Sequence, residues 1–127
     1  TALARHLKEF RLPGVFFRPL FFKPMFQKCA HQVCGGLQIH VTDRKKFRPY
    51  RTGLALLKAV YDLYPRDFRW REKPYEFVGD IPAIDLLTGS EDFRKALEMG
   101  KSWKEILKDS DAGKADFIHL RKNFLLY

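Results

Sequence analysis

The stretch Cys34-Gly35-Gly36-Leu37-Gln38-Ile39-His40-Val41-Thr42-Asp43 decides the fold of this chain. Apolar and polar residues alternate through it, which is the pattern of a β-strand with one apolar and one polar face. The polar face would present Gln38, His40 and Thr42, spaced about 6.6–6.8 Å apart along the strand. We call these three residues the polar row. Two interpretations stay open: a half-buried strand whose polar face is wet, or a strand whose polar row lines a binding site.

The segments on either side of this strand predict its main neighbours. Residues 15–22 are rich in β-forming residues and predict a second strand, at an edge or interrupted, because Pro19 cannot donate to a ladder. Residues 50–64 predict the longest helix in the chain. We expect this helix to be buried over most of its girth against the apolar face of the strand, with Lys58 and Asp62 on its outer side.

Shorter elements account for most of the remaining chain. Apolar spacing and capping residues predict five short helices, at residues 2–10, 80–88, 90–98, 102–107 and 114–122. Alternation over residues 67–72 predicts a short additional strand. The fold is therefore expected to be α+β, with a small mixed or antiparallel sheet, one long buried helix and several short C-terminal helices, in a single domain over residues 1–127.

Positive charge is concentrated in the first part of the chain. Residues 1–52 carry 11 Lys and Arg against two acidic residues, whereas residues 53–127 carry 13 of each sign. Five of the eight residues 44–51 are cations, which predicts either a contact with an anion or a solvated loop. A field polarised in this way favours an anionic partner such as an acidic glycan, an acidic neighbouring domain, a membrane surface or nucleic acid.

The chain carries few groups that could perform catalysis. It lacks the nucleophile elbow, the phosphate-binding loop, the dinucleotide fingerprint and the HExxH zinc motif. The isolated acid–base candidates are His40 and Asp43 at the end of the central strand, while Asp80 and Asp85 are interpreted more simply as capping and surface residues. No run approaches the roughly 20 apolar residues that span a membrane. No cofactor is expected.

Two cysteines, Cys29 and Cys34, flank His31. Three such residues are too few for a zinc site, which needs about four ligands, so no metal is expected. Two ordinary thiols are the default interpretation, and a disulfide that closes a small loop is the alternative if the protein is exported. No signal-like segment begins the chain, and we expect it to be one domain of a larger protein.

Phenylalanine rings and cations are interleaved over residues 16–28. Such a pattern is typical of stacking platforms for single-stranded nucleic acid. The chain has no RNA-binding signature, so the simpler interpretation places the rings in the core and the cations on the solvated face. The residues concerned are Phe16, Phe17, Arg18, Phe21, Phe22, Lys23, Phe26 and Lys28.

Three longer stretches together resemble the C-terminal domain of NamZ-type exo-β-N-acetylmuramidases. They are Leu12-Pro-Gly-Val-Phe-Phe-Arg-Pro19, Cys34-Gly-Gly-Leu-Gln-Ile-His-Val-Thr-Asp-Arg44 and Phe47-Arg-Pro-Tyr-Arg-Thr-Gly-Leu-Ala-Leu-Leu57. The later Ile84-Asp-Leu-Leu-Thr-Gly-Ser90 and Gly100-Lys-Ser-Trp-Lys-Glu-Ile106 follow the same pattern in the same order. The resemblance runs from about Leu3 to Tyr127, nearly the whole chain.

This resemblance implies an auxiliary domain of a bacterial, exported, peptidoglycan-degrading hydrolase that releases N-acetylmuramic acid. A larger Rossmann-like N-terminal domain would carry the main catalytic carboxylate, and the cleft would lie where the two domains meet. The fragment alone would be inactive. Substrate-binding candidates on this chain are Gln38, His40, Thr42, Asp43, Arg44 and Arg51, with Arg18 as a further source of positive charge for a muramic acid carboxylate. A basic nucleic-acid-binding module and a purely structural domain stay as alternatives.

Overall fold

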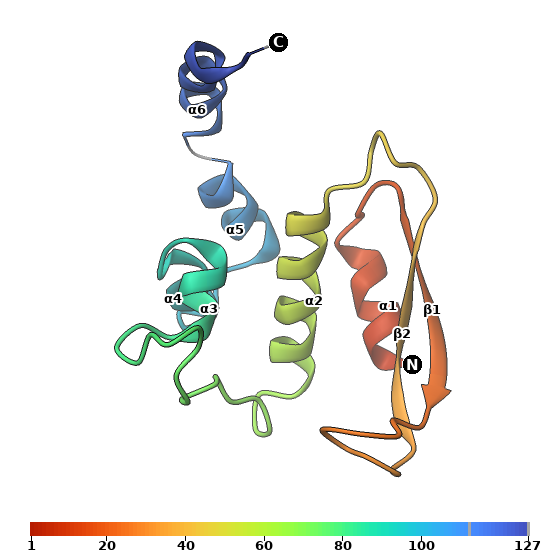
Figure 1. Cartoon of the computed structure of the whole chain (residues 1–127). Helices are drawn as coiled ribbons and strands as arrows, with labels where there is room; N and C mark the ends of the chain where they lie inside the picture. The colour runs from red at the N-terminus through yellow and green to blue at the C-terminus, as the bar shows by residue number, and fades with distance from the viewer. Residues whose placement is uncertain (112, 127) are drawn as a thin grey trace. The chain divides into compact units, whose positions relative to one another are not determined.

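A computed structural model describes residues 1–111 and 113–126 of the chain (Figure 1). The chain forms two compact units, unit 1 over Thr1–Phe68 and unit 2 over Arg69–Tyr127. Unit 1 holds α1 (Ala2–Glu9), β1 (Val15–Phe22), β2 (Cys34–Val41) and α2 (Pro49–Leu63). Unit 2 holds α3 (Ala83–Thr88), α4 (Asp92–Glu98), α5 (Trp103–Ser110), α6 (Lys114–Arg121) and the short 3-10 helix η1 (Lys122–Phe124). The α+β fold class is confirmed.

The sheet of unit 1 is a two-stranded antiparallel ribbon. β1 and β2 pair over their whole lengths, with Val15 opposite Val41 and Phe22 opposite Cys34. Both strands are edges in such a ribbon, so Pro19 can sit in β1 without removing a donor that a further strand would need. The predicted strand pair is therefore correct, and the long connection over residues 23–33 makes the ribbon a hairpin.

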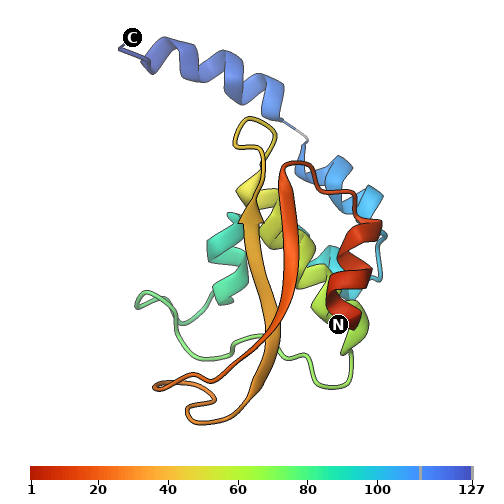
Figure 2. The same cartoon turned by 90° about the vertical axis from the view of Figure 1, so that its right-hand side faces the viewer.

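The helix α1 packs against both β1 and α2 (Figures 1 and 2). Thr1 caps it, since the Ala4 backbone N–H donates to the Thr1 hydroxyl at 3.4 Å. Leu7 is almost completely buried, and Ala4 and Phe10 are buried beside it, as the apolar spacing over residues 2–10 predicts for one face of this helix. The main neighbour of α2 is thus α1. We expected α2 to pack on the apolar face of the strand, and this expectation is wrong.

The expectation that Lys58 lies on the outer side of α2 is wrong. Lys58 is only 8% exposed, and its ammonium pairs with the Asp62 carboxylate one turn later. The same carboxylate lies 3.2 Å from His6 Nε2 of α1. The long aliphatic stem of a lysine can be buried when its charged end is paired. The helix is otherwise buried as predicted, through Thr52, Leu54, Ala55 and Ala59.

Unit 2 consists of short helices that pack in sequence, α3 on α4 and α4 on α5. Its core includes Phe93, Leu97 and Ile106. The predicted capping box opens α5, because the Ser102 backbone N–H donates to Glu105 Oε2 at 2.8 Å and the Glu105 N–H donates to Ser102 Oγ at 3.4 Å. None of the helices in the described ranges is long and apolar enough to cross a membrane.

The short strand expected at residues 67–72 does not form. A strand needs a neighbour for its backbone donors and acceptors, and the ribbon of β1 and β2 is the only sheet in the part of the chain that the structure describes. Trp70 is held instead through its indole, which donates to Glu98 Oε1 of α4 at 3.0 Å.

Candidate functional site

Part of the polar row lies on β2, on a face that combines polar and apolar residues. Gln38 lies opposite Arg18, and His40 lies opposite Phe16, with 6.4 Å between the centroids of the two rings. Gln38 is exposed, whereas His40 is half-buried. His40 Nε2 is shielded from solvent and has no hydrogen-bond partner among the described residues. Gln38 is therefore open to a ligand, while this nitrogen of His40 faces protein.

The loop over residues 42–48, at the end of β2, is fixed to the turn before β1. The backbone N–H groups of Thr42 and Asp43 donate to the Gly14 carbonyl at 2.9 and 3.3 Å. The approach is so close that a Cβ on Gly14 would lie 2.5 Å from the Asp43 carbonyl oxygen and 2.7 Å from the Phe47 nitrogen. Gly14 also has a φ of +72°, in the left-handed region that favours glycine. The loop therefore has a defined backbone.

Asp43 acts as a turn residue inside this loop. Its Oδ1 accepts hydrogen bonds from the backbone N–H groups of Lys45 at 2.9 Å and Lys46 at 3.3 Å. Its Oδ2 lies 3.4 Å from the Lys46 ammonium. A carboxylate engaged in this way holds a loop in place, as Asp side chains commonly do in turns. Asp43 is thus less available for a ligand than its position in the sequence suggested.

The cations of the same loop divide into two roles. Arg48 braces it, since Nη1 donates to the carbonyls of Lys45 at 2.8 Å and Phe47 at 3.2 Å. Arg44, Lys45 and Lys46 are exposed. We call these three residues the basic edge. Asp43 is the only acidic residue of the loop, so a braced backbone presents an excess of positive charge to solvent.

Arg51 lies in the first turns of α2, directly after this loop. Its Nε is buried and has no hydrogen-bond partner in the described structure. Buried polar atoms usually have a partner, so the guanidinium is a group whose hydrogen bonding is incomplete. The structure therefore gathers Thr42, Asp43, Arg44 and Arg51 around one loop, with Gln38 and His40 on the strand that leads into it.

The simpler interpretation placed the aromatic rings of the hairpin in the core, and this expectation is wrong. Phe16, Phe21, Phe22 and Phe26 are 53%, 76%, 47% and 74% exposed, and Phe17 alone of the five is half-buried. The ring of Phe22 lies over Gly36, where a Cβ would be 2.7 Å from it. A side chain at Gly36 would therefore displace this ring. Cys29 and Cys34 are free thiols nearby.

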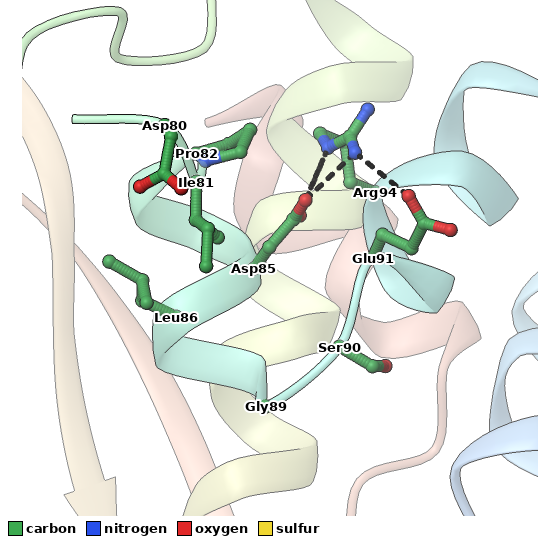
Figure 3. Close-up of a pocket in the computed structure, with 9 residues that line it drawn as sticks. All are labelled: Asp80, Ile81, Pro82, Asp85, Leu86, Gly89, Ser90, Glu91 and Arg94. Carbon is green, nitrogen blue, oxygen red and sulfur yellow. Dashed lines mark hydrogen bonds and ion pairs between the residues drawn. The ribbon is translucent and has the colours of Figure 1, made fainter. Parts of the chain in front are cut away.

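A separate hollow of about 550 Å³ lies in unit 2 between α3 and α4 (Figure 3). Arg94 reaches into it and donates three hydrogen bonds to Asp85, from Nε to Oδ1 at 2.9 Å and to Oδ2 at 3.0 Å, and from Nη2 to Oδ2 at 2.7 Å. Glu91 and Glu98 oxygens lie 3.7 and 3.5 Å from the same guanidinium. The hydrogen bonds to Asp85 raise the pKa of Arg94 above its ordinary value. Because acidic side chains already neutralise its charge, Arg94 joins two helices and is not a free binding site for an anion.

Asp85 was expected at the surface, and that expectation is wrong, since Asp85 is only 6% exposed. Sequence reasoning missed it because the partner, Arg94, follows nine residues later across the Gly89 turn. An acid and a base that flank a helix–turn–helix corner are the signal that could have indicated the pair. Within the described ranges, no three His, Cys, Asp or Glu side chains gather as a metal site would require.

The whole chain is similar to known proteins. The family model described as "Exo-beta-N-acetylmuramidase NamZ, C-terminal" matches residues 1–127. The chain is 37% identical to the peptidoglycan β-N-acetylmuramidase NamZ of Bacillus subtilis (strain 168), over 100% of this chain and 29% of that protein. A crystal structure of a DUF1343 family protein from Bacteroides fragilis matches 99% of this chain and 32% of its own, with a TM-score of 0.75 and 27% identity. The chain thus spans about a third of the length of these relatives.

Proposed function

This chain belongs to the family of C-terminal domains of the exo-β-N-acetylmuramidase NamZ, and from that membership we propose that it is the auxiliary C-terminal domain of a peptidoglycan-degrading glycoside hydrolase. A larger N-terminal region would carry the main catalytic carboxylate, and this domain would complete the substrate cleft. The substrate would be a muropeptide or another peptidoglycan-derived sugar that ends in N-acetylmuramic acid. From the resemblance to this family we also propose that the protein is exported.

The basic edge is the observation that carries this proposal. N-acetylmuramic acid differs from N-acetylglucosamine by a lactyl group with a carboxylate. Arginine and lysine hydrogen bonds to a carboxylate are charge-assisted and stronger than neutral ones. Arg44 and Lys45 are exposed on a loop whose backbone is held by Gly14 and Asp43, so they would meet the carboxylate with little loss of backbone freedom. Gln38 and Thr42, which are exposed, would contact the sugar hydroxyl groups.

Catalysis itself is assigned to the N-terminal region. Glycoside hydrolysis generally needs two carboxyl groups on either side of the scissile bond. Between the start of β2 and the end of α2 the sequence has two acidic residues, Asp43 and Asp62. Asp43 holds the turn and Asp62 pairs with Lys58 and His6. We therefore expect residues 1–127 alone to release no sugar.

The test compares two charge-removing variants of the full-length protein on a chromogenic N-acetylmuramic acid glycoside. Arg44→Gln/Lys45→Gln should raise KM about tenfold, which corresponds to about 1.4 kcal/mol. Arg66→Gln is the control, because Arg66 is exposed just beyond the far end of the 15-residue α2, about 20 Å along the helix axis. Its KM should change by less than about twofold.

Two results would count against the proposal. Equal KM values for the loop variant and the control would remove the basic edge from the substrate site. A full-length protein that releases no N-acetylmuramic acid would overturn the hydrolase assignment altogether. The neutral N-acetylglucosamine glycoside provides a further comparison, since its turnover should be low and should not depend on Arg44 or Lys45.

A second candidate function rests on the exposed rings Phe16, Phe21 and Phe26, which lie among cations in the hairpin. Rings and cations in this arrangement can stack and neutralise single-stranded nucleic acid. Binding of that kind weakens linearly on a plot of log affinity against log salt concentration. Anisotropy of a labelled oligonucleotide at several salt concentrations would show such a slope only if this second function is correct.

A further inference from the structure

The end of the hairpin, residues 21–34, is an arm with an unusually apolar surface. Phe21 and Met25 are 76% and 65% exposed, and Phe26 and Val33 are each 74% exposed. Both views show this arm at the end of the ribbon opposite the loop over residues 42–48 (Figures 1 and 2). Several large apolar side chains exposed within one short segment are a feature of interaction sites in soluble proteins.

The arm has a defined backbone. The His31 N–H donates to the Pro24 carbonyl at 2.7 Å, and the Gln32 N–H donates to the Cys29 carbonyl at 3.1 Å. Gln27, Cys29 and His31 adopt positive φ values of 62°, 57° and 63°. Such a conformation costs each non-glycine residue on the order of 1 kcal/mol and persists where surrounding contacts require it. The side chains are thus presented outward by turns that are already formed.

The arm could be covered by a second copy of this chain, by unit 2 or by another region of the same polypeptide. Charge argues against the first two. A second copy of this chain would bring the same excess of cations in residues 1–52 to the contact, and like charges repel. Unit 2 is balanced in charge over its length, so it offers no general attraction for Lys23 and Lys28 of the arm. The fitting partner is a surface that is apolar at its centre and acidic around it.

The relatives of this chain are about three times as long as it, and their additional region is a candidate for that partner. This C-terminal domain covers 29% of the Bacillus subtilis protein and 32% of the Bacteroides fragilis chain. We propose that the arm docks, through Phe21, Met25, Phe26 and Val33, on an apolar and acid-rimmed surface of the larger N-terminal region of the same polypeptide. This inference rests on the proposed function only in assuming that such a region is present. The arm would anchor the domain while the loop at the other end of the ribbon remains free for substrate.

The experiment measures hydrogen exchange in the full-length protein and its Phe26→Ser and Phe77→Ser variants. Phe77 is the control because it too is an exposed phenylalanine in a loop, at 104% relative exposure against 74% for Phe26. In Phe26→Ser, some N-terminal peptides should exchange about tenfold faster or more, since local protection follows the free energy of opening. Peptides from α2 should be unchanged in both variants, which shows that the domain stays folded.

Each alternative outcome overturns the inference. Unchanged exchange in the N-terminal region would mean that the arm does not dock there. A loss of dimer mass in light scattering would assign the arm to a second copy, and faster exchange confined to residues 69–127 would assign it to unit 2. If α2 itself loses protection in Phe26→Ser, hydrogen exchange is measured in the milder variant Val33→Ser, with the same expected result for the N-terminal peptides. Exchange needs no substrate, so an inactive protein with a docked arm would disprove only the hydrolase function.

Discussion

At the scale of single residues, Gly14 holds the candidate site together. Its carbonyl accepts from Thr42 and Asp43, and no side chain fits there. Gly14→Ala should lower the free energy of unfolding of the full-length protein by about 2–4 kcal/mol, from left-handed strain and overpacking combined. Urea unfolding measures this loss. KM for the muramic acid glycoside should rise as well, because the loop moves.

Gly89 separates the two causes of that loss. It has a φ of +82° but nothing within 4 Å of an added Cβ, so Gly89→Ala brings strain without a clash. It should lower the free energy of unfolding by only about 1–2 kcal/mol. If both alanine variants were equally destabilised, the close approach of Gly14 to Asp43 would not be a determinant of the loop.

The sequence predicted the strand and the loop that carry the candidate residues better than it predicted the contacts of each side chain. The period-2 alternation of residues 37–42 correctly indicated a strand, and the run of cations after it correctly indicated a charged loop. It could not show that the Asp43 carboxylate is used by two backbone N–H groups, because that depends on the turn that residues 43–46 adopt. Nor could it show that His40 Nε2 is shielded, since burial depends on elements distant in the chain.

At the scale of elements, Asp85 and Arg94 join α3 to α4 (Figure 3). The side chains are 6% and 18% exposed, so removing one partner leaves a largely buried charge. Asp85→Ala should lower the free energy of unfolding by about 2–4 kcal/mol. Circular dichroism during urea unfolding would measure the change.

The neighbouring pair of Lys95 and Glu91 is the matched control for this prediction. Its atoms lie 2.6 Å apart, but the side chains are 47% and 54% exposed. Exposed ion pairs contribute little, so Lys95→Ala should change the free energy of unfolding by less than about 1 kcal/mol. Similar losses in the Asp85 and Lys95 variants would show that burial does not set the strength of the α3–α4 pair.

Local signals predicted the helices and the strand pair, but not how these elements pack. Pro49 at the start of α2 and the Ser102–Glu105 capping box are short-range features that a sequence displays directly. The partner of α2 is a long-range property, and α1 rather than the ribbon occupies that place. Lys58 was misplaced for the same reason, because its burial depends on how its charge is paired and on what packs over α2.

At the scale of the whole molecule, the separation of charge poses a question about function. The excess of cations lies entirely in residues 1–52, which contain both the basic edge and the hairpin arm. An anionic substrate and an acidic protein surface would each be attracted by this field. The two proposed contacts lie at opposite ends of the ribbon, so variants at each end can separate their dependence on ionic strength (Figure 2).

We expect kcat/KM of the full-length protein for the anionic glycoside to fall as salt rises from low to physiological concentration, because the Debye length shortens from about 30 Å at 0.01 M to about 8 Å at 0.15 M. Arg44→Gln/Lys45→Gln should flatten this dependence, whereas Lys23→Gln/Lys28→Gln in the arm should leave it unchanged. The arm variant should instead raise the rate of hydrogen exchange in the N-terminal region. Added salt should raise the exchange rate of the wild-type protein to the same level. A salt dependence that follows the arm variant rather than the loop variant would place the anionic substrate at the hairpin, and both proposals would then have to be reversed.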